Sequence, residues 1–189
     1  LEATQRPDKL KAVFDGDTLT ISPSLCVQFS LCAGMDLDEA TFSALKAGVA
    51  KEAARERAVR ILTASAVSER ELEKRLVQKG TLPADAADAV AWLKEHRFVD
   101  DAATAAQLVD SAVRKGYGCA RVKNILYEKG IPKDLWDEAL ARIPAMDDAI
   151  DRFLAAKLRG RTADEKTIKK TIDALLRRGF SYGEIRDAL

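Results

Sequence analysis

The sequence has few of the residue types from which active sites and covalent cross-links are built. It contains one histidine, His96, and three cysteines, Cys26, Cys32 and Cys119, which leave one over from any disulfide and form no metal-type pair. We therefore predict reduced, structural cysteines, as in a cytoplasmic protein. The residues show no phosphate-binding glycine loop, nucleophile elbow or metal-ligand cluster. These absences predict a protein that is not an enzyme and uses no metal and no cofactor.

Long apolar segments are also missing. No run approaches the roughly 20 residues needed to cross a membrane, and no secretory signal is recognisable, so we expect no membrane association. The chain begins at Leu1 rather than methionine, and we expect a start that was cut or processed. Aromatic residues make up only 6% of the chain, whereas alanine, leucine, arginine and lysine are among its most frequent residues. This composition favours a helical protein.

Three segments of the chain align without gaps around a glycine, at Gly80, Gly130 and Gly179. A leucine stands four residues before each glycine, a lysine or arginine stands immediately before it, and a helix-start signal follows it. The glycine is therefore predicted to be the left-handed residue that ends one helix before the next begins. The basic residue is expected to interact with the negative end of the helix dipole.

A further helix is predicted before each such pair, so that every unit holds three helices. Ser68 to Glu71 and Ser181 to Glu184 have the spacing of capping boxes, and Asp100 or Asp101 is expected to cap a helix that runs through Lys115. The positions predicted to face the cores are Ala58, Ile61, Leu62, Leu72, Leu76, Val77, Ala86, Val90, Leu93, Ala105, Leu108, Val109, Ala112, Val122, Ile125, Leu126, Ile150, Phe153, Leu154, Leu158, Ile168, Ile172, Leu175 and Leu176.

The first fifty residues differ in character. Lys9 to Ile21 read as strand, turn and strand around Asp15-Gly16, with Val13, Leu19 and Ile21 at half-buried positions. An isolated hairpin is marginal in water, so it must dock on a helix. The expected partner begins near Asp38, and Gly48 is a position at which it could bend.

These patterns predict an all-α fold. Three tandem three-helix repeats stack into an elongated, curved body, with a small N-terminal β-hairpin plus helix. We place the hairpin and helix in residues 1–52, and the repeats in residues 53–98, 99–143 and 144–189.

The ordered series of motifs resembles the RecX family of bacterial regulatory proteins. The motifs are Ser68-Glu69-Arg70-Glu71-Leu72, Lys79-Gly80, Phe98-Val99-Asp100-Asp101, Arg114-Lys115-Gly116-Tyr117-Gly118 and Lys129-Gly130-Ile131, and the resemblance covers about residues 38 to 189. It implies a monomer that binds the RecA filament on single-stranded DNA. It also implies inhibition of recombinase and co-protease activities, by blocking filament growth or promoting disassembly.

Basic residues gather in the second and third repeats, as binding to such a filament would require. Residues 114–133 contain six basic side chains and one acidic one, and residues 152–178 contain nine basic and three acidic. Tyr117 adds an aromatic side chain between two glycines, which could either stack on a partner or pack over its own turn. The residues predicted to bind the partner are Arg114, Lys115, Tyr117, Arg121, Lys123, Lys157, Arg159, Arg161, Lys169 and Lys170.

Other interpretations of these residues stay open. Lys79, Lys129 and Arg178 stand where helix-dipole capping alone would explain them, and His96 is expected to have a structural role at a helix end. The alternative function is a direct DNA-binding helical module, because short helices joined by tight turns resemble helix-turn-helix units. Weak direct DNA binding is also compatible with the filament interpretation. A repeat scaffold for an unrelated partner is the third possibility.

Overall fold

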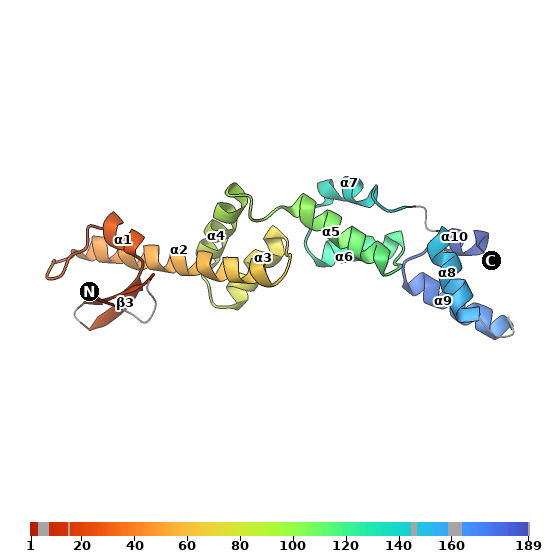
Figure 1. The fold of residues 1–189 in the computed structure, drawn as a ribbon, viewed down its shortest axis with the longest axis horizontal. Helices are drawn as coiled ribbons and strands as arrows, with labels where there is room; N and C mark the ends of the chain where they lie inside the picture. The colour runs from red at the N-terminus through yellow and green to blue at the C-terminus, as the bar shows by residue number, and fades with distance from the viewer. Residues whose placement is uncertain (4–7, 15, 145–146, 159–163, 189) are drawn as a thin grey trace. The chain divides into compact units, whose positions relative to one another are not determined.

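A computed structural model describes residues 1–3, 8–14, 16–144, 147–158 and 164–188 (Figure 1). The chain divides into two compact units. The first unit contains Leu1–Ser65 and Leu72–His96, and the second contains Ala66–Glu71 and Arg97–Leu189. The predicted fold class of an N-terminal hairpin followed by three-helix repeats is confirmed.

The N-terminal hairpin forms as predicted, and a third strand extends it. β2 (Leu10–Phe14) and β3 (Asp17–Ile21) pair antiparallel, and β1 (Glu2–Ala3) adds to the outer side of β2. The burial of Val13 was predicted wrongly: it is 56% exposed, whereas its neighbour Ala12 is buried. Successive side chains of a strand point to opposite faces, so burying Ala12 turns Val13 toward solvent.

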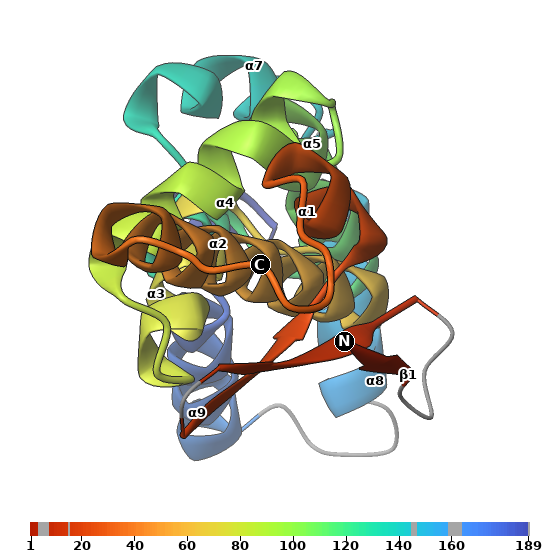
Figure 2. The same ribbon diagram turned by 90° about the vertical axis from the view of Figure 1, so that its left-hand side faces the viewer.

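The sheet docks on one long helix, together with the short helix α1 (Pro23–Gln28) (Figures 1 and 2). This helix, α2 (Glu39–Ala64), begins after the N-cap residue Asp38, as expected, and continues through residues 52 and 53. Lys9 forms ion pairs with Glu52 and Glu56 of α2, which joins the strand to the helix. A Cβ added to Gly48 would lie 3.0 Å from a methyl carbon of Leu25, so this glycine allows α1 to approach α2 closely.

The first repeat uses the C-terminal half of α2 together with α3 (Glu69–Gln78) and α4 (Pro83–Glu95). Leu72 and Leu76 of α3 are buried, as predicted. Val77 was also predicted to be buried, but it is 40% exposed. The same error occurs at Leu176 in the third repeat, which is 42% exposed beside the buried Leu175. Each helical residue is rotated by about 100° from its neighbour, which turns the position after the buried leucine outward.

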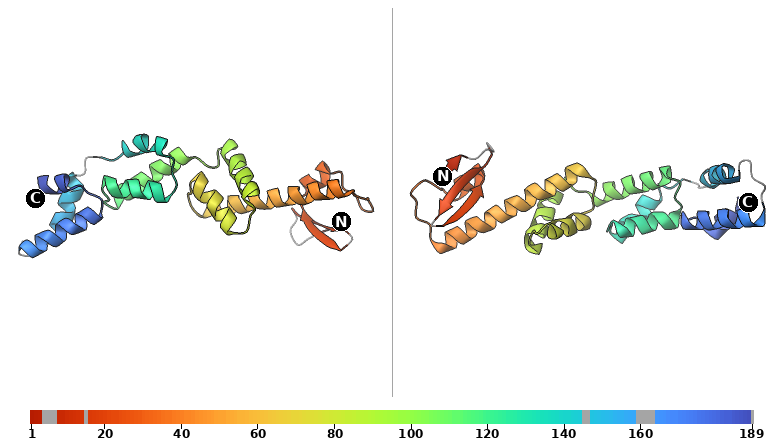
Figure 3. Two further views of the ribbon diagram at one scale, coloured as in Figure 1. Left: turned by 180° about the vertical axis from the view of Figure 1, so that it is seen from behind. Right: turned by 90° about the horizontal axis from the view of Figure 1, so that it is seen from below.

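The second repeat consists of α5 (Asp101–Arg114), α6 (Cys119–Glu128), the 3-10 turn η1 (Lys133–Leu135) and α7 (Trp136–Leu140). Figure 3 shows these helices as one group. Asp100 is the N-cap of α5, and its carboxylate accepts hydrogen bonds from two backbone N–H groups. The core is formed by Ala105, Val109, Ala112, Val122, Leu126, Ile131 and Ala139.

The third repeat consists of α8 (Asp147–Leu158), α9 (Glu165–Arg177) and α10 (Tyr182–Asp187). Its core contains Ile150, Leu154, Leu175, Phe180 and Ile185. The predicted capping box of Ser181 and Glu184 is present at the start of α10.

The three repeat glycines, Gly80, Gly130 and Gly179, all have positive φ angles, as the turn pattern predicted. The residue ranges assigned to the individual repeats stay a prediction.

Candidate functional site

The turn that carries Gly179 packs directly against the turn between α5 and α6. The N–H of Gly118 donates to the carbonyl oxygen of Arg178 at 2.9 Å, and the N–H of Ala120 donates to that of Gly179 at 3.1 Å. A Cβ on either glycine would overlap the other segment: one on Gly118 would meet the backbone of Gly179, and one on Gly179 would meet Arg121. Two backbones can therefore approach this closely only because both positions lack a side chain.

Arg178 completes this junction with its side chain. Its guanidinium donates to the carbonyl oxygen of Lys115 at 3.2 Å and lies 4.7 Å from the ring centroid of Phe153. Helix capping is therefore not the only role of Arg178, because its side chain also ties the third repeat to the second.

A second junction of the same kind joins the Gly130 turn to the start of α3. The buried hydroxyl of Ser68 donates to the carbonyl oxygen of Lys129 and accepts the N–H of Glu71 at 3.1 Å. The ammonium of Lys129 lies 3.2 Å from the Glu71 carboxylate. Lys129 thus also has an ion-pair partner besides the helix dipole. Ser68 and Gly118 occupy equivalent places in their repeats, and each supplies a donor to the carbonyl before a repeat glycine.

The predicted basic residues of the second repeat flank the first of these junctions. Arg114 is the last residue of α5, Lys115 caps that helix, and both side chains are exposed. Arg121 is partly paired, with 3.5 Å between its guanidinium and the carboxylate of Glu128. Lys123 is exposed on α6 and has no ion-pair partner in the part of the chain that the structure describes. The structure therefore gathers the four predicted basic positions of this repeat around one turn.

The predicted residues of the third repeat are distributed over two helices. Lys157 is exposed near the end of α8, and its ammonium lies 5.9 Å from the ring centroid of Phe153. Lys169 and Lys170 are exposed on α9, eight or nine residues before Arg178, which corresponds to about 12 Å along the helix. Arg159 and Arg161 lie outside the described residues.

Tyr117 is half-buried and packs against the core of the second repeat, as Ile125 and Leu135 also do. This is the packing role that the sequence left open, whereas a contact between Tyr117 and a partner stays a prediction.

A second tyrosine, Tyr127, was not indicated by the sequence patterns above and is 70% exposed on α6. It follows Lys123 by four residues, so the two side chains share one face of the helix. The repeat register would have indicated it, because Tyr127 occupies the position of Val77 and Leu176.

One acidic residue near this surface, Asp110, forms an ion pair with Arg142. The guanidinium of Arg142 makes two hydrogen bonds to the Asp110 carboxylate, at 2.9 and 3.2 Å. This pairing, with a smaller effect from Arg114, holds the pKa of Asp110 below its ordinary value. Asp110 therefore stays charged at neutral pH and compensates part of the positive charge of Arg114.

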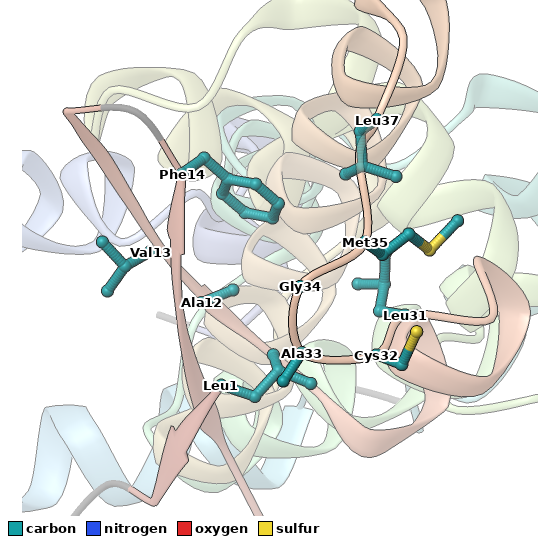
Figure 4. Close-up of a pocket in the computed structure, with 10 residues that line it drawn as sticks. All are labelled: Leu1, Ala12, Val13, Phe14, Leu31, Cys32, Ala33, Gly34, Met35 and Leu37. Carbon is teal, nitrogen blue, oxygen red and sulfur yellow. The ribbon is translucent and has the colours of Figure 1, made fainter.

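The first unit contains a pocket between the sheet and residues 31–37, lined mainly by residues with apolar side chains (Figure 4). No charged side chain lines it, and Figure 4 shows Val13 projecting from the side of the strand opposite Phe14. Among the described residues no cluster of histidine, cysteine and acidic side chains could hold a metal ion. No helix in the same residues is long and apolar enough to span a membrane.

The fold and its junctions define a protein of tandem three-helix repeats joined through glycine turns. Sequence models of the first, second and third three-helix domains of RecX match residues 54–93, 100–140 and 147–189. The chain belongs to the RecX family of regulatory proteins.

Named relatives agree with this assignment. The chain is 33% identical over 146 residues to regulatory protein RecX of Cronobacter sakazakii, covering 69% of this chain and 87% of the relative. It is 37% identical over 95 residues to that of Shigella dysenteriae, covering 45% of this chain and 57% of the relative. A crystal structure of regulatory protein RecX matches with a TM-score of 0.79 at 22% identity, covering 98% of this chain and 96% of the other. RecX from Lactobacillus salivarius matches with a TM-score of 0.62 at 19% identity, covering 74% and 94%.

Proposed function

We propose that this protein binds the RecA nucleoprotein filament on single-stranded DNA and inhibits its recombinase and co-protease activities. In this proposal it acts in the cytoplasm as a monomer and by occupancy, blocking filament growth or promoting disassembly, without catalysis of its own. Its membership of a family of regulatory proteins supports a regulatory role. The single observation that carries the proposal further is the exposed basic surface of the second and third repeats, which includes Lys123, Lys169 and Lys170.

This surface suits a filament that presents phosphates and acidic protein groups. Lys123 and Lys169 have no ion-pair partner in the described residues, so their charges are available to a partner. Tyr127 beside Lys123 adds an exposed ring on which a base of single-stranded DNA could stack. Interactions of both kinds are of the sequence-independent type, which fits a regulator of filaments on any DNA.

The alternative is a direct DNA-binding module that reads a groove with a recognition helix. Such a helix should be basic, but α4 carries the acids Asp85, Asp88 and Glu95 against the single base Lys94. The short helix α7 contains two acids and no base. The charges of the last helices in the first two repeats therefore favour the filament proposal over helix-turn-helix binding.

The decisive test is RecA strand exchange and ATP hydrolysis on single-stranded DNA, titrated with this protein far below the RecA concentration. We expect inhibition at a small fraction of the RecA present, because occupancy of a growing filament affects many subunits. Inhibition only when the protein saturates the DNA would contradict the proposal and favour direct competition for DNA.

A charge variant locates the surface. Replacing Lys123, Lys169 and Lys170 together by alanine is expected to raise the concentration of this protein needed to inhibit RecA. Replacing Lys11, Lys46 and Lys74 together removes equal charge elsewhere and should leave that concentration unchanged.

If the protein also contacts about five phosphates, the logarithm of its affinity for single-stranded DNA should fall against the logarithm of the salt concentration with a slope of about −3.5. The triple variant should reduce that slope by about 2, and a slope near zero would exclude phosphate contacts.

A further inference from the structure

The first repeat contains a basic hollow that the pattern of its sequence does not indicate. Its lining consists of Arg57, Arg60, Ile61, Ala64, Arg75 and Lys79, from α2, α3 and the residue after α3. The four charged side chains of this lining are all cations, although they are spread over more than twenty residues of sequence. The volume of about 470 Å³ is large enough to admit several side chains of a partner.

Three cations of the hollow are only partly satisfied within the described chain. Arg57 donates one hydrogen bond, at 2.6 Å, to the hydroxyl of Thr81, although a guanidinium has five N–H donors. The contact of Arg60 with Glu56 is long, at 3.9 Å. Lys79 is exposed and forms no ion pair with the described residues. Positive charge that is concentrated in this way attracts an anionic ligand.

The two junctions in the second unit indicate which kind of group meets the basic residue before a repeat glycine. The ammonium of Lys129 meets the carboxylate of Glu71, and the guanidinium of Arg178 meets backbone carbonyls at Lys115 and Gly116. In both cases the acceptor is a polypeptide segment. Lys79 is the equivalent residue of the first repeat, and it faces the hollow instead.

The glycine beside Lys79, Gly80, also has no residue packed against the place where a side chain would stand. A Cβ added to Gly80 would meet no atom within 4 Å, whereas one added to Gly130 would lie 3.1 Å from the side chain of Arg70. The turn of the first repeat therefore has a basic residue followed by a glycine, as the other two junction turns have. However, no described segment packs against its glycine.

We propose that this hollow binds an acidic segment of a partner protein, with one apolar side chain between carboxylates. The carboxylates pair with Arg57, Arg60, Arg75 and Lys79, and the apolar side chain lies on Ile61 and Ala64. A protein segment is favoured over nucleic acid because no aromatic side chain lines the hollow, so bases have no ring on which to stack. This inference goes beyond the proposed function, because it concerns a surface separate from the basic residues of the second and third repeats.

Fluorescence anisotropy with a labelled Glu-Glu-Leu-Glu-Glu peptide tests the proposal on the full chain. We expect saturable binding that Lys79→Gln weakens by about threefold to fivefold, in line with one exposed ion pair. Adding Arg60→Gln should bring the loss to about tenfold, because effects at separate contacts add. Lys74→Gln is the matched control: it removes the same charge from exposed α3 outside the hollow and should leave the affinity unchanged.

Two further probes separate the alternatives. Replacing the central leucine of the peptide by glycine should weaken binding to the wild-type chain, which reports the contact with Ile61 and Ala64. Labelled oligothymidylate should bind Lys79→Gln as well as it binds the wild type. The proposal is overturned if the peptide does not bind, if Lys74→Gln has the effect of Lys79→Gln, or if only oligothymidylate binding depends on Lys79. None of these readouts involves RecA, so a failure here is distinct from a failure of the proposed function.

Discussion

At the scale of single residues, the repeat glycines carry two different requirements. Gly80 and Gly179 both have positive φ angles, of 83° and 90°, which an L side chain rarely adopts. Gly179 is also packed against Arg121, whereas nothing lies within 4 Å of the place where a Cβ on Gly80 would stand. The sequence indicates the backbone requirement at both glycines, but only the structure shows the second requirement at Gly179.

Alanine substitutions separate these requirements. We expect Gly80→Ala to lower the free energy of unfolding by about 1–2 kcal/mol, through backbone strain alone. Gly179→Ala should cost at least about 2 kcal/mol more, because the methyl group forces the two turns apart. Urea unfolding followed by circular dichroism measures both losses. Equal losses in the two variants would show that the Gly179 turn tolerates a side chain.

At the scale of helices, the caps differ in how much tertiary structure depends on them. Ser181 caps α10 from an exposed position, and its partners, including Glu184, are all within the same capping box. Ser68 caps α3 as well, but its fully buried hydroxyl also donates to the carbonyl of Lys129. The same residue type therefore has a local role in one helix and both a local and a long-range role in the other.

Removal of the two hydroxyls should expose this difference. Ser181→Ala is expected to cost about 1 kcal/mol of stability, the usual value for a lost helix cap. Ser68→Ala should cost about 2–4 kcal/mol, because it also leaves the buried carbonyl of Lys129 without its donor. The measurement is the midpoint of urea unfolding at an unchanged slope. A smaller loss for Ser68→Ala than for Ser181→Ala would contradict a stabilising hydrogen bond between Ser68 and the carbonyl of Lys129.

At the scale of the whole molecule, the described chain contains separate cores rather than one. Leu45 is fully buried in a cluster with Ala12, Ile21 and Leu25 of the first unit, and Leu126 is fully buried in the core of the second repeat. Separate cores allow local opening, because breaking one does not remove the contacts of the other.

Hydrogen exchange should reveal these separate cores. We expect Leu45→Ala to reduce amide protection mainly in β2, β3 and α2, and Leu126→Ala to reduce it mainly in α5, α6 and α7. Each substitution removes a fully buried side chain and should cost about 2–5 kcal/mol in its own core. Loss of protection across the whole chain in either variant would instead indicate a single cooperative unit.

Most of the architecture could be predicted because its signals are local. The glycine spacing, the caps at Asp38, Asp100 and Ser181, and the hairpin before Ile21 depend on φ preferences and hydrogen bonds within a few residues. The errors at Val13, Val77 and Leu176 have another cause. An apolar residue next to a buried one satisfies a hydrophobic pattern, but only packing decides which of the two faces the core.

The amino-acid sequence by itself determined the three repeats, their glycine turns and the membership of the RecX family, because these depend on short-range chemistry and on the order of motifs. The tertiary structure decided which charges are available to a partner. Arg178 became part of a junction, Lys123 remained exposed, and Lys79 joined Arg57 and Arg60 in a basic hollow. The physical reason is that these relations join residues distant in sequence, and only the packing of helices brings such side chains together.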